Sequence, residues 1–111
     1  MFLRSSNHLL IRGLRWQAAA QAEQLDAWWA ENRQLTPALF AREFAGAVAL
    51  LGIAPGAGAR FHRSALPGIR RIVLKKTKNL VFYTYSRETD VVHIIAVWGA
   101  PKGTDPPLEL P

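Results

Sequence analysis

Apolar side chains recur with the period of an α-helix in residues 17–32. Ala18, Leu25 and Trp29 fall at positions i, i+7 and i+11, so they share one helix face. Trp28 lies beside this apolar stripe and can either widen it or face a partner. The segment therefore predicts an amphipathic helix.

A second helix is predicted to begin at Thr36 and Pro37. A threonine side chain can accept a hydrogen bond from an orphan N–H group at a helix start, and proline suits the first helical position. The apolar stripe that follows consists of Phe40, Phe44, Ala47, Val48 and Leu51. Gly52 and Pro55 end this helix. Because only about four residues separate the two helices, they should form an antiparallel hairpin.

Beyond residue 66 the apolar period falls to two, which is typical of β-strands. Short polar turns separate three segments rich in Val, Ile, Tyr and Phe, namely residues 69–76, 80–86 and 91–98. Because a parallel connection needs a dozen or more residues, these strands should be antiparallel. Residues 55–59 contain helix breakers and are predicted to be a linker within the domain.

Residues 10–16 alternate apolar and polar side chains and predict a short first strand. Residues 1–8 are interpreted as a flexible extension, and residues 99–111 as an irregular tail rich in proline and glycine. The predicted fold class is α+β, with the order β-α-α-β-β-β. A helical hairpin would pack on one face of a small, mainly antiparallel sheet in a single domain, residues 1–111.

Composition supports one globular domain and excludes several function classes. A chain of 111 residues fits one domain of roughly 100–200 residues with a single hydrophobic core. It contains no cysteine, which excludes disulfide frameworks, thiolate metal sites and cysteine nucleophiles. Its apolar runs are shorter than the roughly 20 residues of a membrane span. The N-terminal segment does not resemble a signal peptide, so we expect a cytoplasmic protein.

Charge is distributed unevenly along the chain, whose net charge is +6. Every carboxylate lies in residues 23–43 or 88–109, so residues 44–87 carry cations alone. These cations are Arg60, Arg63, Arg70, Arg71, Lys75, Lys76, Lys78 and Arg87. A field of one sign attracts polyanions, either nucleic acid or an acidic partner protein. The plainer alternative is a solvated face that keeps the protein soluble.

Three local motifs accompany the predicted order of elements. Arg15-Trp16 precedes the first helix, and Pro37-Ala38-Leu39-Phe40 opens the second. The most specific motif combines Pro67-Gly68-Ile69-Arg70-Arg71 with the ending Val97-Trp98-Gly99-Ala100-Pro101-Lys102-Gly103. Together these motifs resemble the RelE/ParE superfamily, the toxins of bacterial type II toxin–antitoxin pairs. The ending is most similar to that of ParE-type members.

The resemblance implies a plasmid-stabilisation toxin that a co-expressed antitoxin holds inactive. In this family the antitoxin's C-terminal segment wraps the helices and the sheet, and an acidic segment would suit this basic chain. The expected antitoxin-binding residues are Trp28, Phe40 and Phe44. ParE-like members poison DNA gyrase by binding, whereas RelE-like members cut mRNA on the ribosome. Fold cannot choose between these targets, so the site residues must. No cofactor or metal is expected.

Metal-free RNA cleavage needs a base for the 2′-hydroxyl, a donor for the leaving oxygen and cations near the phosphorane. By the resemblance, Arg71 falls on one basic position of the nuclease members. Val73 and Leu80 are apolar where a lysine and an arginine would stand. Lys102 can replace a late arginine, but no tyrosine follows it. These departures favour gyrase binding over an mRNA endoribonuclease.

If the chain is nevertheless a nuclease, its candidate catalytic residues are Arg71, Lys75, His93 and Lys102. His93 lies in mid-strand without a carboxylate nearby in sequence, which favours a packing role. His62 lies beside cations, but in a predicted loop, and a solvated loop residue is the plainer interpretation. Candidate target-binding residues are Arg60, Arg63, Arg71, Lys75, Lys76, Lys78, Trp98 and Lys102. A third interpretation is a non-toxic basic module that binds single-stranded nucleic acid through aromatics and cations.

Two pairs of strand residues predict which side of the sheet meets the helices. Arg70 and Arg71 are neighbours, so they point to opposite faces. The arginine that faces the helices needs a carboxylate or must extend to solvent. The available carboxylates are Glu23, Asp26, Glu31 and Glu43. Tyr83 and Tyr85 share one face, which is predicted to pack on the helices.

Overall fold

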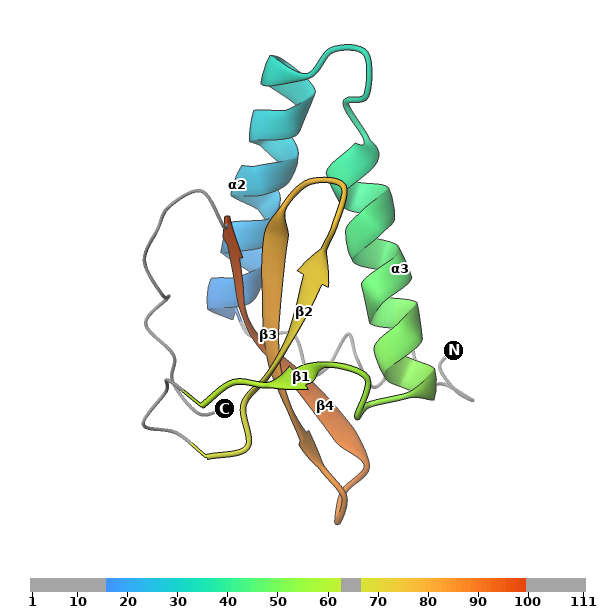
Figure 1. Cartoon of the computed structure of the whole chain (residues 1–111). Helices are drawn as coiled ribbons and strands as arrows, with labels where there is room; N and C mark the ends of the chain where they lie inside the picture. Colours follow the sequence, from blue (N-terminus) through green and yellow to red (C-terminus); the bar gives the residue numbers. More distant parts are fainter. Residues whose placement is uncertain (1–15, 63–66, 100–111) are drawn as a thin grey trace.

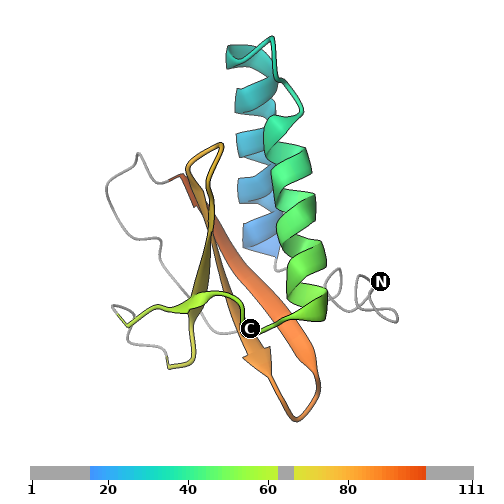
Figure 2. The ribbon, with the colours of Figure 1, turned by 45° about the vertical axis from the view of Figure 1, so that its right-hand side comes forward.

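The computed structural model describes residues 16–62 and 67–99 of the chain. The elements in order are α2 (Trp16–Asn32), α3 (Leu39–Ile53), β1 (Ala59–Arg60), β2 (Arg70–Leu74), β3 (Asn79–Ser86) and β4 (Val91–Gly99). Figures 1 and 2 show the two helices side by side in one layer and the sheet in the other. The prediction of an α+β domain, with a helical hairpin on one face of an antiparallel sheet, is therefore confirmed for this part of the chain.

The strands follow one another across the sheet in chain order, and each neighbouring pair is antiparallel. The polar turn at residues 87–90 joins β3 to β4, as predicted. Residues 75–78 join β2 to β3, so Lys75 and Lys76 belong to the turn instead of the predicted strand, and Asn79 belongs to β3 instead of the predicted turn. The register between β3 and β4 shifts at Phe82/Tyr83, so that Ile95 has no opposite residue. Among the described strands, β4 is the last of the sheet on one side, and α2 packs mainly against it.

The sheet buries apolar side chains in two clusters. In the first, Tyr83 and Ile94 of the sheet pack with Phe40 and Leu51 of α3. The second cluster consists of Phe61, Ile69, Phe82, Ile95 and Ala96. Adjacent strand residues such as Phe82 and Tyr83 serve different clusters because side chains alternate between the faces of a sheet. The helices therefore cover one of two buried faces.

Tyr83 ties the segment before β1 to the centre of the sheet. Its hydroxyl accepts a hydrogen bond from Gly58 N–H at 2.8 Å and donates one to the Pro55 carbonyl at 2.8 Å. Burial raises the pKa of this hydroxyl, although the Gly58 N–H partly offsets the effect, so the group stays protonated and can donate. Tyr83 and Tyr85 both pack toward the helices, which confirms their predicted face.

Arg70 and Arg71 point away from each other, but the partner of Arg70 differs from expectation. The Arg70 guanidinium donates to the carbonyl oxygen of Gly58 at 2.7 Å. Arg71 lies over the ring of Phe61, with its guanidinium carbon 5.5 Å from the ring centre. A backbone carbonyl has therefore replaced the carboxylate expected for the helix-facing arginine. Glu43, one of the carboxylates considered, is bound to a turn instead.

The start of α3 also differs from prediction. The helix begins at Leu39, and its N-cap is Ala38, without a side-chain cap hydrogen bond. Thr36 belongs to the turn between the helices, where its N–H donates to Arg33 and its carbonyl accepts from Leu39. The predicted threonine cap was therefore wrong, because the turn uses the backbone of Thr36.

Two further boundaries need correction. Trp16 opens α2 instead of ending a strand, and its side chain is 74% exposed, so no sheet face holds it. The remainder of that predicted strand, residues 10–15, lies outside the described residues, as do residues 1–8 and 100–111. Ala59 and Arg60, predicted at or after a linker, form β1 by pairing with β2.

Candidate functional site

A groove lies between the C-terminal part of α2 and the turn from β2 to β3, beside the end of β4. This open groove has a volume of about 540 Å³. We call it the α2–turn groove. Its lining residues are Leu25, Trp28, Trp29, Arg33, Lys76, Thr77, Lys78, Asn79 and Gly99. They include cations from both sides and no carboxylate, so the described lining has one sign of charge.

Two tryptophans form the aromatic wall of the α2–turn groove. The ring centres of Trp28 and Trp29 are 5.8 Å apart, with an interplanar angle of 72°, an edge-to-face arrangement. The guanidinium carbon of Arg33 lies 5.0 Å from the Trp28 ring centre and 5.7 Å from that of Trp29. These distances are within the roughly 6 Å of cation–π attraction. Trp28 nevertheless stays 45% exposed, so its ring is accessible to a partner.

The opposite wall is the β2–β3 turn, which a carboxylate of α3 holds in place. Glu43 accepts hydrogen bonds from Lys76 N–H at 2.7 Å, Thr77 N–H at 3.0 Å and Thr77 Oγ1 at 2.7 Å. Burial opposes ionisation of this carboxylate, but the hydrogen bonds from the turn outweigh it and lower the pKa of Glu43. The groove thus takes its shape partly from a helix that does not line it.

Asn79, which lines the groove, also carries an unpartnered polar group. Its residue is 3% exposed, and its Nδ2 is buried without a hydrogen-bond partner among the described residues. A buried amide donor left unpaired costs free energy, because water that bound it in the unfolded chain is lost.

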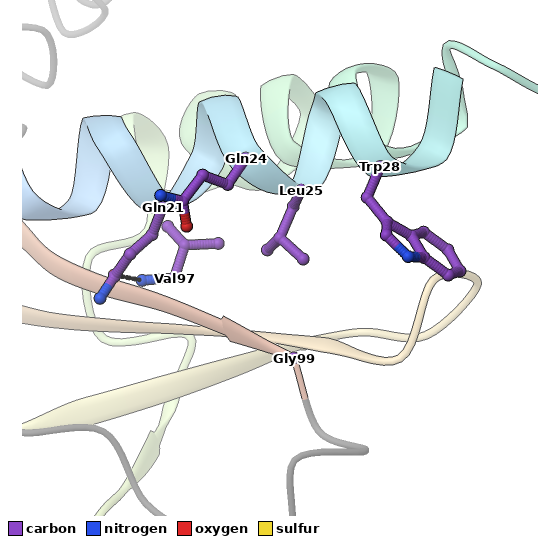
Figure 3. A pocket seen from close by; sticks show the side chains of 6 residues that line it. All are labelled: Gln21, Gln24, Leu25, Trp28, Val97 and Gly99. Carbon is purple, nitrogen blue, oxygen red and sulfur yellow. Dashed lines mark hydrogen bonds between the residues drawn. The ribbon is translucent and has the colours of Figure 1, made fainter. Parts of the chain in front are cut away.

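A smaller hollow of about 190 Å³ shares Leu25, Trp28 and Gly99 with the α2–turn groove. Figure 3 shows the side chains of Leu25 and Trp28 extending from α2 toward the sheet. Gln21 lies farther back along α2, and its Oε1 accepts a hydrogen bond from Val97 N–H at 2.7 Å (Figure 3). The helix therefore satisfies one backbone donor of β4 as well as covering the strand.

The predicted target-binding cations occupy different parts of the surface. Lys75, Lys76 and Lys78 are exposed on the β2–β3 turn, where the last two line the groove. Arg60 is exposed on β1, at the other end of the described strand order. His62, beyond β1, is exposed too. Arg63 and Lys102 lie outside the described residues.

The described nuclease candidates lie on different elements of the sheet. Arg71 lies on β2 and His93 on β4, with β3 between them. Lys75 lies beyond the end of β2, in the turn. On the same face as Arg71, Val73 is 46% exposed and Leu80 packs against the second cluster.

The three other described aromatic residues that were predicted to bind a partner differ in how deeply they are buried. Phe40 is 1% exposed and belongs to the core, so its expected role as an antitoxin contact is corrected. Phe44 is half-buried and stacks on Phe40, with ring centres 5.7 Å apart. Trp98 is half-buried and packs against the second cluster, which makes it more a lid on that cluster than an exposed anchor.

Sequence reasoning singled out Trp28, Lys76 and Lys78 but missed Arg33 and Asn79 as members of the same groove. Arg33 follows the predicted helix, and Asn79 stands in a predicted turn, so neither carries a periodic signal. Arg33 and Asn79 line the same groove only because the chain folds the end of α2 against the β2–β3 turn.

Comparisons of the chain with protein families, with curated proteins and with solved structures found no match. In the part of the chain that the structure describes, no three or more His, Asp or Glu side chains gather as they would around a metal ion. Neither described helix has the length and apolar character to cross a membrane.

Proposed function

We propose that this chain is the toxin of a type II toxin–antitoxin module of the plasmid-stabilisation kind. A co-expressed antitoxin neutralises it, and it inhibits DNA gyrase by binding. The arrangement of a helical hairpin on one face of an antiparallel sheet is compatible with the RelE/ParE resemblance of the motifs. Because fold alone does not define activity, the choice of target rests on the residues.

The observation that carries the choice of gyrase is the apolar character of the face that holds Arg71. Val73 and Leu80 offer no charge there, and Arg71 itself lies against the ring of Phe61. Charge that develops in phosphoryl transfer requires preorganised cations or donors. Val73 and Leu80 supply no such group at their positions, whereas the exposed cations suit binding to another protein.

Tightly repressed, inducible expression in a bacterial host tests toxicity. Colony-forming units should fall after induction and should recover when the neighbouring open reading frame is expressed with this chain. Unchanged growth in spite of confirmed soluble protein would contradict the toxin assignment.

The target is tested with purified protein in two parallel assays. Linear plasmid should accumulate with gyrase, ATP and supercoiled DNA, and message should stay intact in a translating extract. Codon-phased cuts in the message, without linear plasmid, would assign the RelE-like nuclease activity instead. Salt-sensitive binding of single-stranded nucleic acid without any effect on growth would favour the non-toxic module.

A further inference from the structure

The side of α3 that points away from the sheet exposes large apolar side chains. Phe40, Ala47 and Leu51 lie on the other side of this helix and are buried in the core. Leu50, in contrast, is 44% exposed, and Ile53 is 84% exposed. A single exposed apolar residue is ordinary, whereas a continuous apolar face indicates an interaction surface.

The exposed positions on this side of α3 form one stripe, which we call the outer α3 face. They are Arg42, Ala45, Gly46, Ala49, Leu50 and Ile53. Arg42 is the one charged residue of this face. The exposed positions of α2, by comparison, include the carboxylates Glu23, Asp26 and Glu31. Because a helix surface that stays in water normally carries charged or polar residues, the outer α3 face is suited to contact with another apolar surface.

Gly46 lies in the middle of the outer α3 face, where nothing within the described chain requires a glycine. A Cβ atom added there would have no neighbour within 4 Å. Glycine also weakens a helix relative to alanine. The lack of a side chain does, however, allow the backbone of another helix to approach closely, since side-chain size at the contact sets the distance between helix axes.

The residues of the outer α3 face complement one another in an antiparallel pair of α3 helices. In a two-fold pair that crosses between Ala47 and Val48, each residue lies opposite the one at the same distance from the crossing point. Gly46 then lies opposite Ala49 of the second copy, which allows close approach. Leu50 lies opposite Ala45 of the second copy, so a large side chain meets a small one.

The charge of the outer α3 face is complementary in the same arrangement. Arg42 lies opposite Ile53 of the second copy, at the C-terminal end of the second α3. The last turn of α3 contains no basic residue of its own, so its carbonyl groups present partial negative charge. Each Arg42 supplies a cation to the other copy, and the two arginines stay at opposite ends of the pair. An acidic partner would find only this one cation on the face.

The size of the outer α3 face indicates a weak, reversible contact. The 15 residues of α3 form a helix about 22 Å long. Two such helices bury about 400 Å² on each copy, roughly half of the 800 Å² per partner in stable complexes. Association in the micromolar range is therefore expected.

We propose that the outer α3 face binds a second copy of this chain through an antiparallel, two-fold pair of α3 helices. Gly46 and Ala49 form the centre of the contact, Leu50 packs over Ala45, and Arg42 lies at the C-terminal end of the second α3. This dimer does not depend on the proposed function.

Sedimentation equilibrium of the full-length chain, from about 5 to 500 μM, tests the association. The mean mass should rise from that of one chain toward that of two, with a dissociation constant of roughly 10–500 μM. Higher salt should strengthen the dimer, because each copy carries a net charge of +6 while its contact face is mainly apolar. The mass of one chain at every concentration, or association that salt weakens, would overturn the proposal.

Three variants at exposed helix positions test the surface. Gly46→Leu adds apolar area but keeps the helices apart, so it should weaken the dimer at least about tenfold. Ala49→Lys places like charges near the crossing point and should have a similar effect. Ala27→Lys adds the same charge to an exposed position of α2 and should stay within about twofold of the parent chain. Equal effects of the two lysine variants, or stronger association of Gly46→Leu, would exclude this face.

Cross-linking tests the orientation of the two helices. Because the chain contains no cysteine, one introduced thiol is the only site for a short bismaleimide reagent. A mixture of Arg42→Cys and Ile53→Cys chains should form cross-linked pairs of the two variants faster than either variant forms pairs with itself. Faster linking of Arg42→Cys to itself would mean a parallel pair and would overturn the proposed arrangement. Circular dichroism of every variant checks that the fold is retained.

Discussion

At the scale of single residues, the most constrained contact is that between Gly58 and Tyr83. A Cβ atom added to Gly58 would lie 2.7 Å from the Tyr83 hydroxyl oxygen and 2.9 Å from the Arg71 carbonyl oxygen. Real Cβ atoms do not approach other atoms so closely, and one of these neighbours is backbone that cannot turn aside. The hydroxyl oxygen is also the acceptor for Gly58 N–H, so a shift of Tyr83 would break that bond.

We therefore predict that Gly58→Ala destabilises the protein by about 1–3 kcal/mol, the usual cost of overpacking. Urea denaturation followed by circular dichroism measures the change. Gly46→Ala is the matched control, because Gly46 lies within α3 and nothing lies within 4 Å of an added Cβ. Alanine there should stabilise the protein by about 0.5–1 kcal/mol through helix propensity. Equal stabilities for both variants would contradict the proposed close approach.

At the scale of elements, side-chain groups join the helices to the sheet at two places. Glu43 of α3 binds the β2–β3 turn, and Gln21 of α2 binds the backbone of β4. The partners of Glu43 lie more than thirty positions further along the chain. No local pattern in the sequence reports such contacts, because periodicity describes only the residues within one element.

The Glu43 contact predicts a pH-dependent stability. The pKa of Glu43 in the folded chain is below its ordinary value of 4.5, so the folded state favours the carboxylate. Its contribution is present above the unfolded pKa and is lost as the pH falls through 4.5 toward the folded pKa. Glu43→Gln should lower the free energy of unfolding by about 1 kcal/mol at pH 7, since the contact is partly exposed.

Urea midpoints of the parent chain and Glu43→Gln, measured from neutral to acidic pH, test this prediction. The difference between them should shrink once Glu43 is protonated. Glu31→Gln serves as the control, because Glu31 is an exposed carboxylate on α2. A difference that stays constant down to acidic pH would mean that the turn does not depend on the ionised carboxylate.

The Gln21 contact predicts a second effect at this scale. Gln21→Ala removes the acceptor from the part-buried Val97 N–H and should cost about 1–2 kcal/mol. Gln24→Ala, at an exposed position on the same helix, should change stability by less than about 0.5 kcal/mol. Hydrogen exchange of the Val97 amide provides the local measurement, and it should accelerate only in the Gln21 variant. Unaltered exchange in that variant would show that the amide is protected by other means.

At the scale of the whole molecule, hydrophobic periodicity was sufficient to predict both helices, the three main strands and their antiparallel pairing. It missed β1 because two residues, Ala59 and Arg60, have no measurable period. It also placed the start of α3 too early, since Thr36 can serve a turn as readily as a cap. Of the α2–turn groove, sequence patterns revealed Trp28 and the cationic turn. The unpaired amide of Asn79 depends on how the elements pack and has no sequence signal.

One substitution, His93→Gln, can distinguish gyrase inhibition from mRNA cleavage, the two activities found in the RelE/ParE superfamily. His93 is a described strand residue with an imidazole, the side chain that most often serves as a general base, and β3 separates its strand from that of Arg71. If the chain inhibits gyrase by binding, His93→Gln should leave plasmid linearisation by gyrase within about twofold of the parent chain. If it cleaves mRNA with His93 as the base, cleavage should fall about 10²–10⁴-fold. Both assays are run on the same protein preparation, with circular dichroism as the check on folding. A hundredfold loss of mRNA cleavage, with no gyrase effect in either chain, would replace the binding mechanism with a catalytic one.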